Sequence, residues 1–488
     1  MKKVIRGAVL VLACMLVLTQ HVAAQTDNTP YSYTYDANKN ALPGPAPFEA
    51  AIQIDTQQLG VGRLTGAQGL FVRDDRVYIC DTGNDRILEL SIQNDTVSLV
   101  RQIKECSGQM LKQPYDVYVS EDGDLYIADY GNQRVLCTDK DLQIRMTLTA
   151  ASVYGEGTQV AFKPQKLAVA SGGHIYVQAQ GINEGLINFD SDGNFASFFG
   201  ASPVKFDWAD YMWKVFSTDA QKAQMAQFVP TEYNNVTVDD EGFLFVTTAV
   251  FSDSELMNGQ AQPLRRLNLK GNNILIENDP NWYVMGDVVW DQNGSTKFVD
   301  VAALSDGTYY ALDKTRCHIF RYDEQGNFLY AFSGRGSRAG YFQNPVAIED
   351  LGSDLLVLDS ASNYITLLRE TRYGALISEA IHAYDSGEYD LAYEKWSEVL
   401  ALNGNYAMAY RGIGRILLRK GQYREALDYL EYAEDAYYYS KAWKLYRKDM
   451  IEEYLFYAVG AVAAVAVTVF VVKKVQKLRQ EVREYAES

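Results

Sequence analysis

The sequence predicts a mainly β protein: a six-bladed β-propeller, followed by an α-helical module and one transmembrane helix. Related β-rich segments recur through the first three quarters of the chain, helical spacing replaces them afterwards, and a long uncharged apolar run lies near the C-terminus. The clearest recurrence is "YICDTGNDRILEL" at 78–90, which returns as "YIADYGNQRVLCT" at 126–138. Self-similarity at a spacing of tens of residues is typical of repeat architectures.

Six such units can be aligned between residues 48 and 370. Each unit is a short run of alternating apolar and polar residues, a turn rich in Asp and Gly, and further β-rich runs. This pattern is typical of successive antiparallel strands. Six four-stranded units predict a propeller. The last unit stops after its third strand, because "TRYGALISEAIHAY" has helical spacing. We expect residues 48–56, "FEAAIQIDT", to supply the missing outer strand and to close the ring.

Composition narrows the class of protein. The chain has 488 residues and a net charge of -17, and this acidity disfavours nucleic acid as a partner, since phosphate binding needs a basic face. Beyond Cys14, only four cysteines remain, too few for a disulfide framework, and we expect them to be buried thiols.

The N-terminus has the layout of a secretory signal, with basic residues, an apolar run and small residues at its end. We expect a signal peptide over residues 1–24, with cleavage after Ala24, and an extended leader over residues 25–47. An uncleaved anchor, or a lipoprotein attached through Cys14, is the alternative.

The C-terminus predicts a membrane anchor. Residues 454–472, "YLFYAVGAVAAVAVTVFVV", carry no charge and are long enough to cross a bilayer core of about 30 Å. Five basic residues follow within the tail, residues 473–488, and favour its retention on the cytoplasmic side. We therefore expect a single-pass protein of the cell membrane, with the N-terminal domains outside and the C-terminus in the cytoplasm.

A helical repeat lies between the propeller and the predicted span. Gly387, Tyr389 and Ala392 recur at Gly421, Tyr423 and Ala426, with an interval of 34 residues in each case. This period, with a small Ala where paired helices touch, resembles tetratricopeptide repeats, and we expect such a module over residues 373–450. It is either a rigid spacer or a peptide receptor.

The motif "LYIADYGNQRVLCTD" resembles the NHL repeat, and residues 48–370 resemble six-bladed NHL propellers. The leader "PYSYTYDANKNALPGPAPFEA" resembles that of envelope NHL proteins which accompany sugar ABC transporters in Gram-positive bacteria. This resemblance implies carbohydrate uptake or envelope organisation as the process served, with sugar transporter components among the partners.

The repeated Asp-x-Gly-Asn-x-Arg is interpreted as structural, because a catalytic group would not be needed at the same corner of several blades. We expect Asp81 and Asp129 to accept hydrogen bonds from turn amides and the Arg to begin the third strand. We expect the Gly to supply a positive φ, and Asn84 and Asn132 to tolerate the left-handed conformation.

Three long insertions, residues 201–233, 249–262 and 279–298, are expected on one face of the propeller, here called the top face, where the turns between second and third strands lie. They supply an aromatic set suited to stacking on sugars or burying a protein partner: Trp208, Tyr211, Trp213, Phe216, Trp282, Tyr283 and Trp290. All of these except Phe216 are the predicted ligand-binding residues. The alternative is that the aromatic side chains pack on the blades.

Alignment of the innermost strands predicts a polar ring at the channel mouth: Gly69, Asp116, Lys166, Asn235, Asp300 and Val346. Lactonase-like six-bladed propellers hold a divalent ion at such a place, and this resemblance implies that Asp116, Asn235 and Asp300 could bind Ca²⁺. Lys166 could instead neutralise the carboxylates, which would leave a solvated polar channel.

No catalytic residue is assigned. Only His174, His318 and His382 remain in the mature chain, the last in the helical module, so the three-histidine zinc site of amidating-lyase propellers cannot be built. The sequence therefore predicts a membrane-anchored binding or scaffold protein without a cofactor, with a glycan or envelope protein as its ligand. The alternative is a lactonase-like hydrolase that uses Ca²⁺ at the polar ring.

Overall fold

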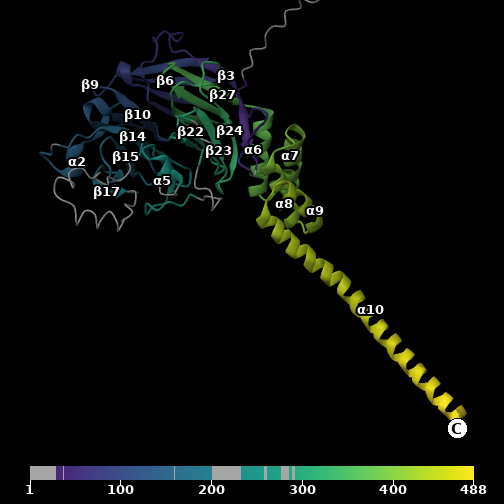
Figure 1. Ribbon diagram of the computed structural model, residues 1–488. Helices are drawn as coiled ribbons and strands as arrows, with labels where there is room; N and C mark the ends of the chain where they lie inside the picture. The colour runs from purple at the N-terminus through teal and green to yellow at the C-terminus, as the bar shows by residue number, and fades with distance from the viewer. Residues whose placement is uncertain are drawn as a thin grey trace, which may run out of the picture. The chain divides into compact units, whose positions relative to one another are not determined.

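The structure is a computed structural model, and it describes residues 29–36, 38–158, 160–200, 232–257, 261–275, 285–287 and 292–487. The chain divides into two compact units, Met1–Ala375 and Leu376–Ser488. The first is built of strands and the second of helices (Figure 1). The predicted signal peptide lies outside the described residues.

The first unit is a six-bladed β-propeller whose sheets follow one another in chain order. Blades 1 to 3 have four antiparallel strands each: β4 (Gly69–Arg73), β5 (Arg76–Asp81), β6 (Arg86–Gln93) and β7 (Thr96–Ile103); β10 (Pro114–Val119), β11 (Leu125–Asp129), β12 (Arg134–Thr138) and β13 (Ile144–Leu148); β14 (Pro164–Val169), β15 (Ile175–Ala179), β16 (Leu186–Phe189) and β17 (Phe195–Phe199). Small elements complete this part: η1 (Thr82–Asn84), η2 (Tyr130–Asn132), β8 (Glu105–Cys106), β9 (Gln109–Met110) and α2 (Ala150–Tyr154).

Blades 4 to 6 complete the ring. Their strands are β18 (Asn235–Val238), β19 (Leu244–Thr247) and β20 (Leu264–Leu267); β21 (Phe298–Ala303), β22 (Tyr309–Asp313), β23 (His318–Tyr322) and β24 (Phe328–Ser333); β25 (Pro345–Leu351), β26 (Asp354–Asp359) and β27 (Tyr364–Glu370). The helix α5 (Asp253–Met257) lies in the insertion of blade 4. Within the described part of blade 4, the expected fourth strand is represented by one bridge, between Leu267 and Asn273.

The ring is closed at two levels. Each innermost strand contacts the innermost strand of the next blade, and β25 of blade 6 returns to β4 of blade 1. Blade 6 takes its outer strand from the other end of the domain, because β3 (Phe48–Ile54) pairs antiparallel with β27. The sequence placed this closing strand at residues 48–56. Side chains of blades 1 and 6 share one hydrophobic cluster, in which Leu70 and Ile79 pack with Leu356 and Leu358.

The leader takes part in the propeller, which the sequence analysis did not predict. The strands β1 (Ser32–Tyr35) and β2 (Ala41–Pro43) form a hairpin, and β1 pairs with β24, so that blade 5 becomes a six-stranded sheet. Tyr33 is buried in the core of this blade. The hairpin covers the edge of β24 that would otherwise expose unpaired backbone groups.

The second unit is helical, and its helices are α6 (Arg372–Asp385), which begins at the end of the first unit, α7 (Tyr389–Leu402), α8 (Ala407–Arg419), α9 (Tyr423–Tyr432) and α10 (Ala436–Glu487). The 34-residue period has structural counterparts. Tyr389 and Tyr423 begin α7 and α9, and Ala392 and Ala426 are fully buried. Gly414 faces α9 so closely that a Cβ would lie 2.6 Å from Leu430. The tetratricopeptide assignment itself stays a prediction.

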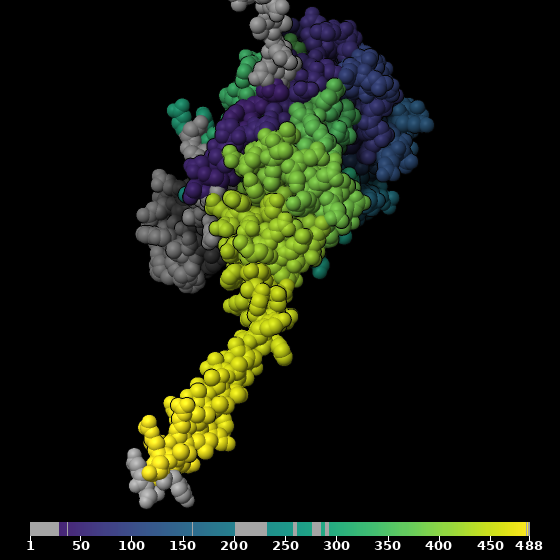
Figure 2. Space-filling view, turned by 90° about the vertical axis from the view of Figure 1, so that its right-hand side faces the viewer, coloured from purple at the N-terminus to yellow at the C-terminus, as the bar shows by residue number. Residues whose placement is uncertain are grey.

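The last helix contains the apolar run. Residues Ala436–Glu484 form a 49-residue helix with a window of mean hydropathy 2.5, long and apolar enough to cross a membrane. None of that window is buried against other described residues, and Figure 2 shows the end of α10 projecting by itself. By length and composition, this helix could span a bilayer.

Candidate functional site

The repeated Asp and Arg residues hold the corners of blades 1 and 2. Asp81 is fully buried and accepts hydrogen bonds from the Thr65 amide at 2.8 Å, from Asn84 Nδ2 at 2.8 Å and from Arg86 Nε at 2.7 Å. In blade 2, Asp129 binds the Lys112 amide, Asn132 and Arg134 in the same way. The motif is therefore an internal support of each corner, and its carboxylates are not available to a ligand.

Two details of this motif were predicted wrongly. Gly83 and Gly131 do not have positive φ; the left-handed residues are Asp85 at φ 53° and Gln133 at φ 57°. Glycine is required for space instead, because a Cβ on Gly83 would lie 2.6 Å from the Thr65 carbonyl oxygen. The Asn of the motif contributes its amide to the Asp carboxylate rather than adopting an unusual backbone conformation.

The strand pairings show whether the predicted ring positions are equivalent from blade to blade, and they require one correction of register. Five of these residues occupy the same place in their blades. Each pairs with the residue just before the position that holds the motif Asp in blades 1, 2 and 5: Gly69, Asp116, Lys166, Asn235 and Asp300. In blade 6 this place belongs to Ala347, which pairs with Leu358, and not to Val346. A bulge between Pro345 and Ala347 shifts the register by one residue, as it does in blades 2, 3 and 5.

The ring side chains bind the neighbouring blades. Asp116 Oδ2 accepts a hydrogen bond from the Leu167 amide of blade 3 at 3.0 Å, and Asp300 Oδ2 accepts one from the Ile348 amide of blade 6 at 2.8 Å. Asp300 Oδ1 accepts from Asn235 Nδ2 of blade 4 at 2.5 Å. The two carboxylates and the amide thus join successive blades around the channel.

Lys166 lies among these carboxylates, with its Nζ 3.7 Å from Asp116 Oδ1. Burial opposes the charge on Lys166, but Asp116 and Asp300 outweigh it and hold its pKa above the usual value. Burial raises the pKa of Asp116, and the charge of Lys166 partly counteracts this rise. Burial also raises the pKa of Asp300, to about 6. The pKa of Glu349 is also raised, first by burial and then by Asp300.

This arrangement does not fit a Ca²⁺ site. The amide of Asn235 presents its nitrogen to Asp300, and Lys166 occupies the position of a cation beside Asp116. Ca²⁺ takes at least six oxygen ligands, so an ion at the mouth would have to displace Lys166 and break the bonds between blades. Among the residues that the structure describes, no group of three or more His, Cys, Asp or Glu side chains is arranged to hold a metal ion.

The raised pKa of Asp300 predicts a pH dependence of stability. A carboxyl group whose pKa is higher in the folded state stabilises that state most at pH values below its ordinary pKa of 3.8. This stabilisation is lost as the pH rises through about 6. The cost of Asp300→Asn should therefore be larger at pH 4 than at pH 7, by up to about 3 kcal/mol. Urea unfolding of both proteins, followed by circular dichroism between pH 4 and 8, measures this difference. Asp122→Asn, at an exposed turn, should give a flat difference; the same flat result at Asp300 would contradict the prediction.

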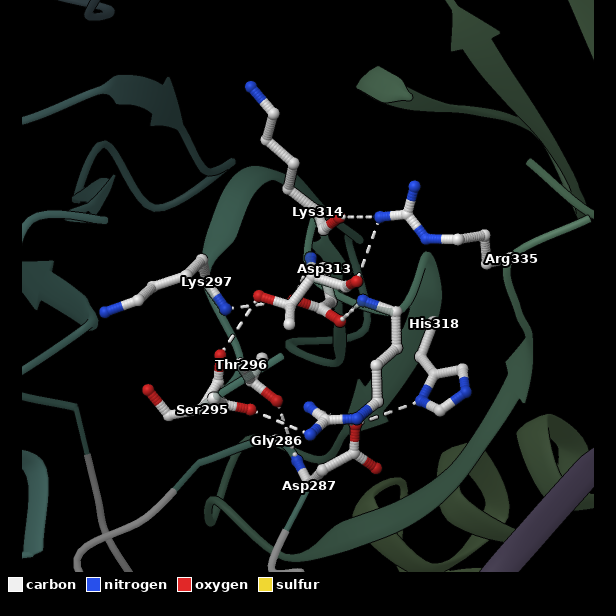
Figure 3. A network of polar contacts seen from close by, with 12 residues as sticks. Gly286, Asp287, Ser295, Thr296, Lys297, Asp313, Lys314, His318 and Arg335 are labelled. Carbon is white, nitrogen blue, oxygen red and sulfur yellow. Dashed lines mark hydrogen bonds and ion pairs between the residues drawn. The ribbon is translucent and has the colours of Figure 1, made fainter. Parts of the chain in front are cut away.

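A second polar network lies on the top face of blade 5. His318 begins β23, five residues after Asp313, where blades 1 and 2 have the Arg of the motif. Asp313 accepts hydrogen bonds from the backbone amides of Thr315 and Arg316 in its own turn and from that of Lys297. His318 instead turns to Asp287 of the preceding insertion, with 3.0 Å between His318 Nδ1 and Asp287 Oδ2 (Figure 3).

Asp287 contacts side chains from two other segments of the chain, the leader and the turn that leads into β23. Tyr33 of the leader donates to Asp287 Oδ1 and lies 3.0 Å from His318 Nδ1, and Arg316 Nη1 lies 3.5 Å from Asp287 Oδ2. Burial opposes ionisation of Asp287, but the hydrogen bonds and charges of His318, Tyr33 and Arg316 hold its pKa below the usual value. Burial, then Asp287, raises the pKa of Tyr33, which therefore remains a donor. The network ties the leader hairpin to the top of blade 5.

This network was missed by the sequence analysis. Its signal was the departure "DKTRCH" from the repeat, which placed His318 at the Arg position. Neither Asp287 nor Tyr33 could be paired with it from sequence, because they lie 31 and 285 residues away in the chain. The predicted aromatic ligand residues, Trp208, Tyr211, Trp213, Trp282, Tyr283 and Trp290, lie outside the described residues, as does Phe216.

Parts of the chain are similar to known proteins. Residues 111–137 match the NHL repeat. This match covers the first three strands of blade 2, including the corner held by Asp129. A probable peptidyl-α-hydroxyglycine α-amidating lyase of Caenorhabditis elegans is 29% identical over 116 residues, which are 23% of this chain. The chain matches 33% of the length of that lyase.

Solved structures share the propeller fold at low sequence identity. The gluconolactonase XC5397 of Xanthomonas campestris is 12% identical, with a TM-score of 0.41, over 70% of this chain and 95% of its own. The virginiamycin B lyase of Staphylococcus aureus is 13% identical, with a TM-score of 0.38, over 71% of this chain and 97% of its own. The reactions named for these proteins belong to them.

Proposed function

We propose that this protein is a membrane-anchored, extracytoplasmic binding or scaffold protein that holds a glycan or an envelope protein on the top face of its propeller. The main support for the proposal is that the carboxylates predicted at the channel mouth already bind other residues of the protein. Asp116 and Asp300 accept hydrogen bonds from amides of neighbouring blades, and Lys166 forms an ion pair with Asp116. The hydrolase alternative depends on these same carboxylates being free for Ca²⁺, so binding is favoured over hydrolysis. The insertions and the Asp287 network of the top face are features that the six blades alone do not supply, and we expect the ligand to bind on this face.

The expected process is carbohydrate uptake or envelope organisation, with sugar transporter components as candidate partners, because the leader and the repeats resemble those of such envelope proteins. The helical unit would act as a spacer between the propeller and the span. Two experiments test the proposal, one for topology and one for binding.

The topology experiment uses introduced thiols. The four cysteines of the described residues are buried, so background labelling should be low. A thiol at Lys270→Cys, in an exposed turn of blade 4, should react with an impermeant maleimide in intact cells. One at Glu484→Cys, beyond the apolar run, should react only after permeabilisation. Removal of residues 454–488 should release the protein from alkaline-washed membranes. The opposite labelling pattern would contradict the proposed sidedness.

The binding experiment uses the full chain in detergent. Immobilised glycans and chemical cross-linking to envelope proteins should capture the wild type. Replacement of Trp208, Trp213 and Trp282 by Ala should abolish this capture without changing the circular dichroism, because aromatic side chains supply most of the contact area in such sites. Unchanged capture by a folded triple variant would show that the insertions are not the binding surface. No capture of any glycan or protein would contradict the proposed function.

A further inference from the structure

The top of blade 5 is basic in a protein whose net charge is -17. Two neighbouring segments produce this: the turn 314–318, "KTRCH", and the connection 334–344 to blade 6, "GRGSRAGYFQN". Together they contain Lys314, Arg316, Arg335 and Arg338, besides His318, and no Asp or Glu. We call these two segments the blade 5 basic face.

The two segments are joined to each other. Arg335 Nη2 donates to the carbonyl oxygens of Lys314 at 3.3 Å and Thr315 at 3.0 Å, which places the connection against the turn (Figure 3). The ammonium of Lys314 and the guanidinium of Arg338 are exposed, and neither has a hydrogen bond or ion pair to the residues that the structure describes. Their charges therefore face solvent.

The nearby carboxylates do not neutralise these two cations. Asp313 is fully buried and accepts the amides of its own turn and of Lys297, and Asp287 is occupied by Tyr33, His318 and Arg316. Blades 1 and 2 differ, because there the Arg of each turn pairs with the Asp of the same turn. In blade 5, by contrast, His318 stands at the Arg position of the repeat, and the exposed Lys314 lies in the same turn.

Tyr341 lies beside one of these cations, Arg338, and Tyr31 contacts Tyr341. The Arg338 guanidinium lies over the Tyr341 ring, 4.6 Å from its centroid. The Tyr341 hydroxyl accepts a hydrogen bond from the Tyr31 amide at 2.8 Å, and the Tyr31 side chain is 47% exposed. The exposed Tyr31 ring offers a flat apolar surface for a sugar ring, and the guanidinium of Arg338 offers a partner for a negative charge on that sugar.

We propose that the blade 5 basic face binds the anionic group of an acidic carbohydrate, with Lys314 and Arg338 as its charge partners and Tyr31 as the stacking surface. The proposal rests on the proposed binding function and names the class of its ligand. An acidic peptide is disfavoured, because it would use the cations but would have no need of the exposed tyrosine. A neutral glycan would not need the cations.

The test measures binding of the full chain in detergent to polygalacturonate, dextran sulfate, polyphosphate, polyglutamate and neutral dextran at low and high salt. Wild type should bind an acidic polysaccharide more tightly than dextran, and this affinity should fall with salt. The variant Lys314→Gln/Arg338→Gln should weaken it about tenfold, or about 1.4 kcal/mol. The matched control Lys140→Gln/Lys270→Gln removes the same charge from exposed turns elsewhere and should leave it unchanged. Tyr31→Ala should weaken binding of polysaccharide but not of polyglutamate.

Three outcomes would overturn the inference. Equal behaviour of the two double variants would show that the blade 5 basic face is not the site. Tight binding of polyglutamate or polyphosphate, unaffected by Tyr31→Ala, would assign the face to a peptide or a phosphate polymer. The relative affinities for polygalacturonate and dextran sulfate distinguish a carboxylate from a sulfate ligand. A wild type that binds neutral glycans but no polyanion would contradict this inference while leaving the proposed function intact.

Discussion

Replacing Asp81 by Ala is expected to lower the free energy of unfolding of the propeller by about 4 kcal/mol, because it leaves a buried cation without its partner. Arg86 is 6% exposed, and its Nε lies 2.7 Å from Asp81 Oδ2. The amide of Thr65 would lose its acceptor as well. Asp129→Ala should cost less, because the Arg134 side chain is 14% exposed and can reach water.

Urea unfolding of the full chain, followed by the β-sheet signal in circular dichroism, measures this cost. Asp122→Ala, at an exposed turn, is the matched control and should change stability by less than about 0.5 kcal/mol. The double variant Asp81→Ala/Arg86→Met should be more stable than Asp81→Ala alone, because replacing both members of a buried ion pair removes the unpaired charge. A double variant as unstable as the single one would show that the ion pair is not the cause.

The parts of the fold that could be predicted from sequence are those with local signals. The corners at Asp81 and Asp129 repeat almost letter for letter, and each blade is written as consecutive strands joined by short turns. Two predictions about the motif failed, because the sequence shows where a glycine lies but not which contact requires it. Gly83 looks like a turn glycine, yet the constraint is the Thr65 carbonyl, 18 residues earlier in the chain.

The features that could not be predicted depend on pairing between distant segments. The leader hairpin carries no repeat signal, and its partner β24 lies some 300 residues further along the chain, as the pairing of Tyr33 with Ala331 shows. The bulge before Ala347 is invisible in the sequence, and it moved the ring position away from Val346. The Asp287 network depends on both the leader and an insertion. Only its His318 was marked, by standing where the repeat has Arg.

Gly69→Ala is expected to destabilise the propeller by about 3 kcal/mol or more, because blade 1 approaches blade 2 too closely at this position for any side chain. A Cβ on Gly69 would lie 2.4 Å from the Tyr115 carbonyl oxygen and 2.9 Å from Asp116 Cα, both of them backbone atoms of the neighbouring innermost strand. Relief would require β4 and β10 to move apart, and the contacts between the innermost strands continue around the whole ring. The strain therefore cannot be confined to one turn.

Gly172→Ala is the matched control, because the nearest atom to its Cβ would be His174 Cδ2 at 3.7 Å, an ordinary contact. The same urea unfolding should show a change of less than about 0.5 kcal/mol there. Native-state hydrogen exchange adds a spatial test: in Gly69→Ala the amides of β4 and β10 should lose protection together, and so should the Leu167 amide of β14, which Asp116 binds. If only the amides of β4 lost protection, or if both alanine variants were equally stable, the close approach of the first two blades would not be what requires glycine at this place in the ring.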